Sequence, residues 1–324
     1  MRKSLSRFKI YAQALFPLLG TGLLLSFLIS SCSWEDDAQF IPETQEIYIL
    51  VEENDPSSQI LYQIVDTQVI PFLPGTDVTD IDGADTELWM CVQGQVRVYD
   101  AESQEERSWR GQDFEATALV VGETTVLLCD SINDQLVFLD RQKLTEESRK
   151  SPVVSPQLPF YKAGKFYLVE NDSTLRVYQE TAYALIRTLP FPLPISDIYT
   201  NDRADLFLGH SSDGMYRETM LDVNGIQILA QTEETDYTKR RFSPYPRANF
   251  GKELLGNLRL FLDQRVSNTV QAQDFEADFL EAEIYYLAQD TLSRYDWFEK
   301  TIHTYPISGS KILGFHTYID YPQL

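Results

Sequence analysis

The feature that most constrains this chain of 324 residues is a short pattern that recurs at a nearly constant interval. Two apolar or aromatic residues followed by Asp end an alternating run, as in Val98-Tyr99-Asp100 within the stretch QVRVYDAESQ. The marker positions are Asp66, Asp100, Asp140, Gln179 (a drifted copy), Asp222, Asp263 and, with Arg294 in place of the first apolar residue, Asp296. Successive markers are 34, 40, 39, 43, 41 and 33 residues apart, with a mean of about 38. Such a period indicates a repeat architecture built from one supersecondary unit.

Each marker ends the second arm of a predicted hairpin. Apolar and aromatic runs precede short turns that contain Gly94, Asn133, Asn171 with Asp172, Gly256 with Asn257, and Asp290. Gly, Asn and Asp suit tight hairpins because they tolerate a positive φ. The leucines of residues 251–263 imitate a helix, but the Gly256-Asn257 pair inside that run predicts a hairpin instead.

Four short strands with their turns fit into one period. We expect them at 78–83, 87–92, 96–100 and 105–109 in the second repeat, and at 195–200, 204–209, 215–222 and 225–230 in the fifth. A repeated four-stranded sheet of this size is typical of a β-propeller. Seven markers predict an all-β, seven-bladed β-propeller, and six or eight blades are alternatives because the first and last intervals are short. The leftover strand at 311–320 is expected to close the ring beside the strand at 46–53.

One repeat resembles a known family. The stretch VYDAESQEERSW, residues 98–109, resembles the repeat of quinoprotein-type (PQQ-like) and YncE-like propellers, in which an Asp-Ala-x-Ser/Thr turn follows a strand and a Trp comes a few residues later. FLDRQKL and RYDWFEK match more loosely, the usual turn Gly is missing, and the docking Trp occurs in one repeat only. The resemblance extends over residues 46–324 and implies the propeller architecture, but no cofactor. The recurrent Asp is interpreted as a turn-capping residue.

The first residues resemble an export leader. Arg2, Lys3, Arg7 and Lys9 precede an apolar stretch at 10–29 and then Ser30-Ser31-Cys32, which predicts a signal peptide at 1–31. A single uncleaved membrane span is the rival interpretation. Ile29-Ser30-Ser31-Cys32 is similar to a bacterial lipobox, in which a peptidase cuts before the Cys and the sulfur then carries diacylglycerol. This resemblance implies lipidation of Cys32.

The residues after Cys32 add an expected location. The acidic cluster in Ser33-Trp34-Glu35-Asp36-Asp37 is similar to the surface-export signal of Bacteroidota lipoproteins. The resemblance implies an outer-membrane lipoprotein, lipid-anchored through Cys32 on the cell surface or the periplasmic side. We expect a flexible acidic tether at 32–45 and the propeller at 46–324.

Composition limits the partners. Removing the leader leaves 23 basic and 49 acidic residues, a net charge of −26, which repels nucleic acid. Lys239-Arg240-Arg241 is interpreted as a solvated loop. Cys91 and Cys129 lie in apolar runs and are expected to be buried thiols, with a disulfide between them as the alternative. Two cysteines cannot make a structural zinc site alone, and no metal is expected.

In a propeller, the turns between second and third strands all lie on one face, so the repeat register predicts an acidic rim there. Such a rim could grip a protein partner, a cationic ligand or a divalent ion, or it could consist of solvated turns. Residues 79–85 are the most calcium-like stretch but lack the spacing of an EF-hand loop. The candidate rim residues are Glu52, Glu53, Asp55, Asp130, Asp134, Glu170, Asp172, His210, Asp213 and Asp290.

No catalytic group stands out. Structural roles are expected for His210, His303 and His316. Carboxylate-pair catalysis stays open, because it depends on the distance between two carboxyl groups, which the sequence does not give. We therefore expect a monomeric, lipid-anchored binding or scaffold module for a protein or glycan partner at the outer membrane. The alternative is a carbohydrate-active or quinoprotein-like enzyme whose site lies over the central channel.

Overall fold

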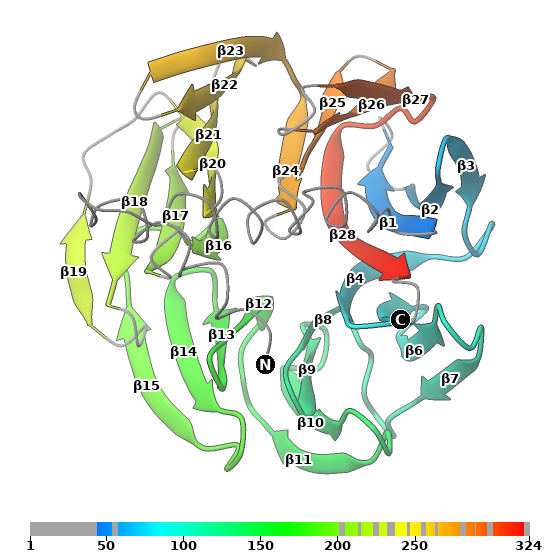
Figure 1. The fold of residues 1–324 in the computed structure, drawn as a ribbon. Helices are drawn as coiled ribbons and strands as arrows, with labels where there is room; N and C mark the ends of the chain where they lie inside the picture. Colours follow the sequence, from blue (N-terminus) through cyan, green and yellow to red (C-terminus); the bar gives the residue numbers. More distant parts are fainter. Residues whose placement is uncertain are drawn as a thin grey trace, which may run out of the picture. The chain divides into compact units, whose positions relative to one another are not determined.

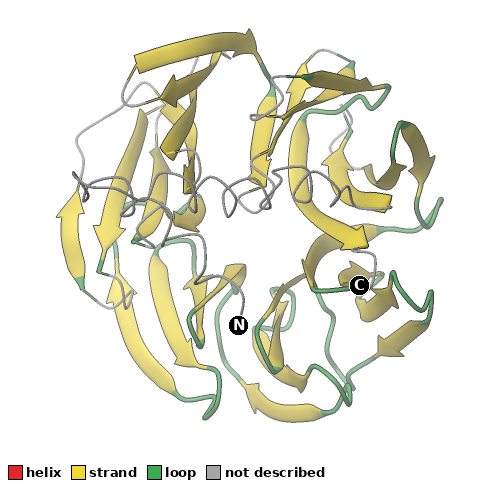
Figure 2. Cartoon of the chain, viewed as in Figure 1, coloured by secondary structure: helices red, strands yellow, loops and turns green. Residues whose placement is uncertain are grey.

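The computed structural model describes residues 44–53, 58–200, 205–212, 215–222, 227–231, 237–244, 247–253, 257–262, 265–278, 283–288, 290–296 and 301–320. Within these residues the strands form seven four-stranded antiparallel sheets, which we call blades 1 to 7 (Figures 1 and 2). The predicted all-β propeller is therefore confirmed. The leader, Cys32 and most of the expected tether lie outside the described residues.

The first three blades, with strands given from the centre outwards, contain twelve of the strands. Blade 1 consists of β28 (Lys311–Asp320), β1 (Thr44–Glu52), β2 (Gln59–Val65) and β3 (Gln68–Pro71). Blade 2 consists of β4 (Val78–Ala84), β5 (Glu87–Val92), β6 (Gln95–Asp100) and β7 (Glu106–Trp109). Blade 3 consists of β8 (Ala118–Val121), β9 (Thr125–Asp130), β10 (Gln135–Asp140) and β11 (Glu146–Lys150).

The other four blades follow in chain order. Blade 4 consists of β12 (Gln157–Lys162), β13 (Lys165–Glu170), β14 (Thr174–Gln179) and β15 (Leu185–Pro190). Blade 5 consists of β16 (Asp197–Thr200), β17 (Leu206–Ser212), β18 (Met215–Leu221) and β19 (Ile228–Gln231). Blade 6 consists of β20 (Tyr237–Pro244), β21 (Arg247–Glu253), β22 (Asn257–Leu262) and β23 (Arg265–Gln271). Blade 7 consists of β24 (Asp274–Asp278), β25 (Glu283–Ala288), β26 (Thr291–Asp296) and β27 (Ile302–Tyr305).

The last strand closes the ring. β28 pairs with β1 from Thr44↔Asp320 to Glu52↔Lys311, so the first and last strands of the ring form one sheet. Each inner strand contacts the inner strand of the next blade, in the order β4, β8, β12, β16, β20, β24 and β28, and β28 contacts β4 again. The strand expected at 46–53 begins two residues earlier than predicted, at Thr44. The hairpin expected within 251–263 is present as β21 and β22.

The marker residues cap the turn between the third and fourth strands. In five blades the marker N–H donates to the carbonyl five residues later: Asp100 to Glu105, Asp140 to Thr145, Gln179 to Ala184, Asp222 to Gln227 and Asp296 to Thr301. The carboxylate of Asp100 also accepts the N–H of Ser103 at 2.8 Å, and that of Asp140 accepts the N–H of Lys143 at 2.8 Å. These bonds satisfy turn amides, so the recurrent Asp has the structural role inferred from the sequence.

The core lies between blades. Trp89 and Val98 of blade 2 pack with Leu128 of blade 3, and other clusters fill the seams between blades 3 and 4, 4 and 5, 7 and 1, and 1 and 2. Cys91 belongs to the blade 2/3 cluster and Cys129 to the blade 3/4 cluster, and both are buried free thiols. The expected burial of the thiols is confirmed, and the alternative of a disulfide between them is excluded.

The topology gives the ring two different faces. One face carries the turns between second and third strands together with the blade-to-blade connections, and we call it the connection face. The opposite face carries the other turns, and the start of β1 lies there beside the end of β28. We call it the terminal face, because the chain enters and leaves the ring on that side.

Candidate functional site

A channel with a volume of about 970 Å³ lies at the centre of the ring. Residues from all seven inner strands line it, and Glu52 of β1 also contributes. The walls differ in chemistry: Leu119, Val121 and Phe160 are apolar, whereas charged residues come from blades 1, 2, 5, 6 and 7. This channel is a candidate for a site because residues from every inner strand converge on it.

Five charged side chains form one ion-pair cluster in the channel wall. Lys239 and Arg241 extend from β20, Asp274 and Glu276 from β24, and Asp197 from β16. The Arg241 guanidinium donates to both Glu276 oxygens at 2.9 Å, and Lys239 Nζ lies 3.1 Å from Asp274 Oδ1. Such a bidentate pair is a strong charge-assisted contact.

Burial alone would raise the pKa of Glu276, but Arg241 and Lys239 outweigh it and lower the pKa to about 2. Glu276 is therefore ionised throughout the physiological range. The interpretation of Lys239-Arg240-Arg241 as a solvated loop is wrong, because these residues lie in β20 and the side chains of Lys239 and Arg241 are paired in the channel wall. Sequence reasoning missed this cluster.

Two aspartates on the opposite wall bond to a neighbouring strand. Asp80 Oδ2 accepts the N–H of Leu119 at 2.8 Å, and Asp82 Oδ2 accepts the N–H of Val121 at 2.7 Å. Asp274 Oδ2 does the same for the N–H of Ile312 in β28, at 2.9 Å. An inner strand has one edge without a partner strand, and unpaired amides there would be costly. These carboxylates therefore join adjacent blades at their inner edges.

The carboxyl groups of Asp80 and Asp82 have raised pKa values. Burial raises the pKa of Asp80 to about 7, with a smaller contribution from the charge of Asp82, although the N–H of Leu119 opposes the change. Burial also raises the pKa of Asp82 to about 6, against the N–H of Val121 and the charge of Arg141. The calcium-like stretch at 79–85 is thus a strand whose aspartates cap backbone amides, and it does not form a metal-binding loop.

Two predicted rim residues of blade 3 are bonded within the fold. Asp130 is fully buried and accepts the N–H groups of Glu115, Ile132 and Asn133 at 2.8–3.0 Å. Asp134 Oδ1 accepts the N–H of Ser155 at 2.8 Å. Both carboxylates fix loops of the connection face.

The two rim residues of blade 4 behave in the same way. Glu170 is buried, forms an ion pair with Arg176 and accepts the N–H of Val154 at 3.0 Å. Asp172 has an exposed side chain whose Oδ1 accepts the Nε2–H of Gln157 at 2.6 Å. The connection face therefore has an ordered hydrogen-bond pattern at blades 3 and 4.

The sequence pattern predicted that His210 lies in a turn, and this prediction is wrong. His210 lies inside β17 and is buried, with Nδ1 at 3.2 Å from the Pro194 carbonyl and Nε2 at 3.0 Å from Thr219 Oγ1. Burial lowers its pKa. These contacts give His210 a packing role between β17 and the connection that precedes β16.

The remaining rim residues are spread around the ring. Glu52 ends β1 and reaches the channel, Glu53 follows it, and Asp290 occupies an exposed turn between β25 and β26. Asp55 and Asp213 lie outside the described residues. The structure thus brings Asp130, Asp134, Glu170 and Asp172 together through shared loops, but Asp290 belongs to a distant blade.

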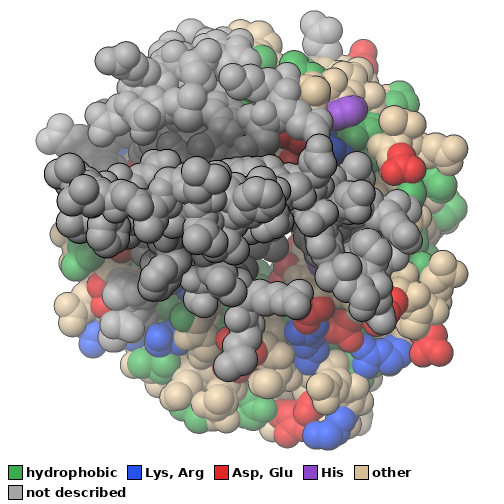
Figure 3. Space-filling view, viewed as in Figure 1, with side chains coloured by type: hydrophobic (Ala, Val, Ile, Leu, Met, Phe, Trp, Pro, Cys, Tyr) green, Lys and Arg blue, Asp and Glu red, His purple; other side chains and the backbone are tan. Residues whose placement is uncertain are grey.

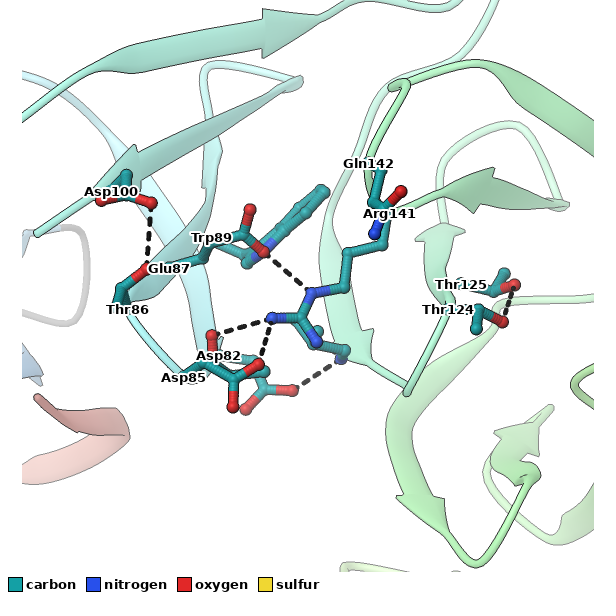
Figure 4. Close-up of polar contacts among 12 residues, drawn as sticks. Asp82, Asp85, Thr86, Glu87, Trp89, Asp100, Thr124, Thr125, Arg141 and Gln142 are labelled. Atoms are coloured by element: carbon teal, nitrogen blue, oxygen red, sulfur yellow. Dashed lines mark hydrogen bonds and ion pairs between the residues drawn. The ribbon is translucent and has the colours of Figure 1, made fainter. Parts of the chain in front are cut away.

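The terminal face carries a separate ion-pair network around Arg141. Its guanidinium lies 2.8 Å from Glu87 Oε2 and 2.9 Å from Asp85 Oδ2, and it donates to the carbonyl of Ala84 at 3.0 Å (Figure 4). Arg141 therefore joins blade 3 to blade 2. In the lower part of Figure 3, acidic and basic side chains lie next to one another on the described surface.

The position of Arg141 is repeated in the next blade. Arg141 follows the marker Asp140, and Glu180 follows the marker Gln179. Glu180 Oε1 accepts the N–H groups of Thr124 at 2.8 Å and Thr125 at 3.1 Å, so it joins blade 4 to blade 3. In blades 3 and 4 the residue after the marker is thus a blade-to-blade contact, which a comparison of these two repeats could have suggested.

The described residues provide few other sites. Among them, no three His, Cys, Asp or Glu side chains are grouped so that they could hold a metal ion. The described residues contain no helix that is long and apolar enough to cross a membrane. Models of known protein families and the sequences of curated proteins yield no match to this chain.

Proposed function

We propose that the propeller is a binding or scaffold module that a lipid on Cys32 anchors to the outer membrane, where it engages a protein or glycan partner. The observation that carries this proposal is the position of the chain ends. β1 begins beside the end of β28 on the terminal face, so the chain enters the ring on the side opposite the connection face. β-Propellers suit such a role because a rigid ring positions many loops on one face.

The polar residues of the ring also favour binding over catalysis. The carboxylates and the histidine that stand out in the sequence hold turns, strand edges or blade seams, as Asp130, Glu170 and His210 do. A catalytic base needs access to a substrate proton. Side chains that are used in this way stabilise a platform on which exposed loops recognise a partner.

Lipidation is tested by growing cells with an alkyne-tagged fatty acid and measuring the label on the purified protein. The wild-type chain and a Cys129→Ala control, which removes a buried thiol, are expected to carry the label, and Cys32→Ala is expected to lose it. Protease digestion of intact cells then tests outward display. Label that persists in Cys32→Ala would contradict the anchor.

The partner is tested by chemical cross-linking on intact cells, comparing the wild-type protein with the soluble Cys32→Ala form. A discrete cross-linked product that both forms give is expected. If neither form gives a product at any cross-linker length, the binding function is rejected.

A second candidate is a channel enzyme, and the raised pKa values of Asp80 and Asp82 favour it, because a carboxyl that titrates near neutrality suits acid–base catalysis. A carbohydrate-active enzyme would turn over members of a glycan panel and lose this activity in Asp80→Asn. A quinoprotein-like enzyme would show a quinone absorption band when purified. Absence of both turnover and the band between pH 5 and 8 would leave the binding module alone.

A further inference from the structure

Two exposed aliphatic side chains on the connection face differ from the others in the described residues. Ile132 is 63% exposed and Val154 is 44% exposed. The other large exposed aliphatic residues of the described chain all lie on outer strands at the perimeter, namely Ile70, Leu185, Ile186, Ile228, Leu229 and Ile302. Isolated surface hydrophobic residues need no explanation, but Ile132 and Val154 lie in face loops that are bonded to one another.

These loops form one continuous surface, which we call the acidic ledge and define as residues 112–115, 130–135, 151–155 and 170–173. Backbone bonds connect its parts: Val153 N–H donates to the Asp134 carbonyl at 2.9 Å, and Asn171 N–H donates to the Val154 carbonyl at 2.9 Å. The N–H of Glu115 donates to Asp130 at 2.8 Å. The ledge is therefore fixed before any partner arrives, which lowers the entropy cost of binding.

The ledge has an excess of negative charge. Its four segments contain six carboxylates and no Lys or Arg. Two arginines contact it from neighbouring strands: Arg149 donates to the Gln112 carbonyl at 3.0 Å, and Arg176 forms an ion pair with Glu170. Asp130 and Glu170 are buried, but Asp113, Glu115 and Asp172 are exposed in the same bonded loops as the two aliphatic side chains. We expect a partner that covers Ile132 and Val154 to meet these carboxylates. Cationic side chains fit that position and anionic ones are repelled.

The ledge and the described chain ends lie on opposite faces of the ring. Eleven residues separate Cys32 from Thr44, and a fully extended segment of this length spans at most about 40 Å. The segment joins the ring on the terminal face. The connection face lies about 20 Å further from that attachment, the length of a six-residue strand.

We infer that the acidic ledge is the docking surface for a cationic polypeptide segment that carries aliphatic side chains, which pack on Ile132 and Val154. The inference rests on the proposed function, because it assigns the partner class and the face. A second copy of this chain fits poorly, since its net charge of −22 would bring like charges together.

The test uses full-length lipidated protein in phosphatidylcholine nanodiscs and a fluorescein-labelled peptide, Lys-Lys-Gly-Leu-Ser-Leu-Gly-Lys-Lys. Fluorescence anisotropy is expected to show saturable binding that weakens with salt. Ile132→Ser with Val154→Ser is expected to weaken binding about fivefold or more. The same variant is expected to leave unchanged the affinity for a peptide in which Ser replaces both Leu residues, because the apolar contact is then absent from both partners.

A matched pair of charge variants tests the electrostatic part. Asp113→Asn with Glu115→Gln is expected to weaken binding about threefold or more at low salt, with a smaller effect at high salt. Glu102→Gln with Glu105→Gln, two exposed residues on the terminal face, is the charge control. Leu185→Ser on β15 is the control for loss of an exposed aliphatic side chain. Both controls are expected to bind like the wild type.

Four results would overturn the inference. They are no binding of the cationic peptide, equally tight binding of a peptide with Glu in place of Lys, equal weakening by the control variants, and a dimer in sedimentation that Ile132→Ser dissociates. The last result would assign the surface to a second copy of the chain. Failure of the proposed function is distinguishable, because a wild-type chain without lipid label would refute the anchor, whereas peptide binding by the wild-type and variant proteins in solution would still test the ledge.

Discussion

At the scale of single residues, carboxylates take the place of a missing neighbouring strand. The inner edge of β8 presents the N–H groups of Leu119 and Val121, and Asp80 and Asp82 accept them. Ionised carboxylates are strong acceptors, but burial disfavours their charge. The raised pKa of Asp80, about 7, reflects this conflict. The stability of the seam between blades 2 and 3 is therefore expected to depend on pH.

Replacing Asp80 by Asn is expected to make the protein more stable at pH 8. The unfolded carboxyl has a pKa near 3.8 and the folded one about 7, so between these values the folded state holds a proton that the unfolded chain has lost. The contribution of Asp80 to the free energy of unfolding is therefore greatest below about pH 4 and falls until about pH 7. Asn keeps an acceptor oxygen without the charge. Urea unfolding at pH 5 and pH 8 should show a smaller difference for Asp80→Asn than for the wild type.

Two further variants define the origin of that effect. Asp80→Ala removes the acceptor for the N–H of Leu119 and should cost about 1–3 kcal/mol of stability at pH 5. Asp77→Asn changes an exposed carboxyl just before β4 and should leave the pH dependence intact. A wild-type protein whose stability does not fall between pH 5 and pH 8, together with an unchanged Asp80→Asn curve, would contradict the assignment.

At the scale of strands, the seam between β28 and β4 depends on a close approach. A Cβ on Gly314 of β28 would lie 2.9 Å from the Ile81 carbonyl oxygen, and a Cβ on Gly83 of β4 would lie 2.1 Å from His316 Nδ1. Real Cβ atoms do not come so close to other heavy atoms, so glycine permits the two strands to pack. The strand that closes the ring thus meets blade 2 through two glycines.

Gly83→Ala is expected to destabilise the protein by about 1–3 kcal/mol, because the added methyl group overpacks the seam. Thermal unfolding followed by circular dichroism measures the loss. The double variant Gly83→Ala with His316→Ala removes the colliding ring, and it should be less destabilised than the sum of the two single variants. Additive effects would show that the Gly83–His316 contact does not limit packing.

At the scale of the whole molecule, the ring is held by contacts between blades that are neighbours in space, and only one blade combines the two ends of the chain. β28 covers the inner edge of β1 and contacts both β24 and β4. Its removal would expose apolar residues such as Ile47 and Ile49, which are now buried. Ring closure therefore contributes to the stability of every blade, because each blade buries its apolar faces only against its neighbours.

Deleting residues 311–324 is expected to abolish cooperative unfolding, because the truncated ring has an open edge on each side of the gap. Deleting residues 321–324 leaves β28 complete and is the matched control, which should melt like the full-length chain. Differential scanning calorimetry compares the two. A chain without β28 that keeps the melting temperature of the control would show that closure is not required.

The repeats were predictable because their determinants are local. The carboxylate of Asp100 bonds to Ser103 three residues away, so the same residue type recurs wherever the same turn recurs. The strand at 311–320 was left over after seven repeats, so its pairing with the first strand of the ring could be predicted. Residue identity and spacing therefore determined the propeller, its turns and its closing strand.

The channel required the tertiary structure. Arg241 pairs with Glu276, which is 35 residues away, and Asp80 bonds to Leu119, which is 39 residues away. In the sequence, alternating charges resemble a solvated strand face. No local signal distinguishes a charged side chain that faces water from one that faces another blade. Closing the ring reduces the contact of these groups with water, and partial desolvation favours pairing with an opposite charge or with an unpaired N–H group.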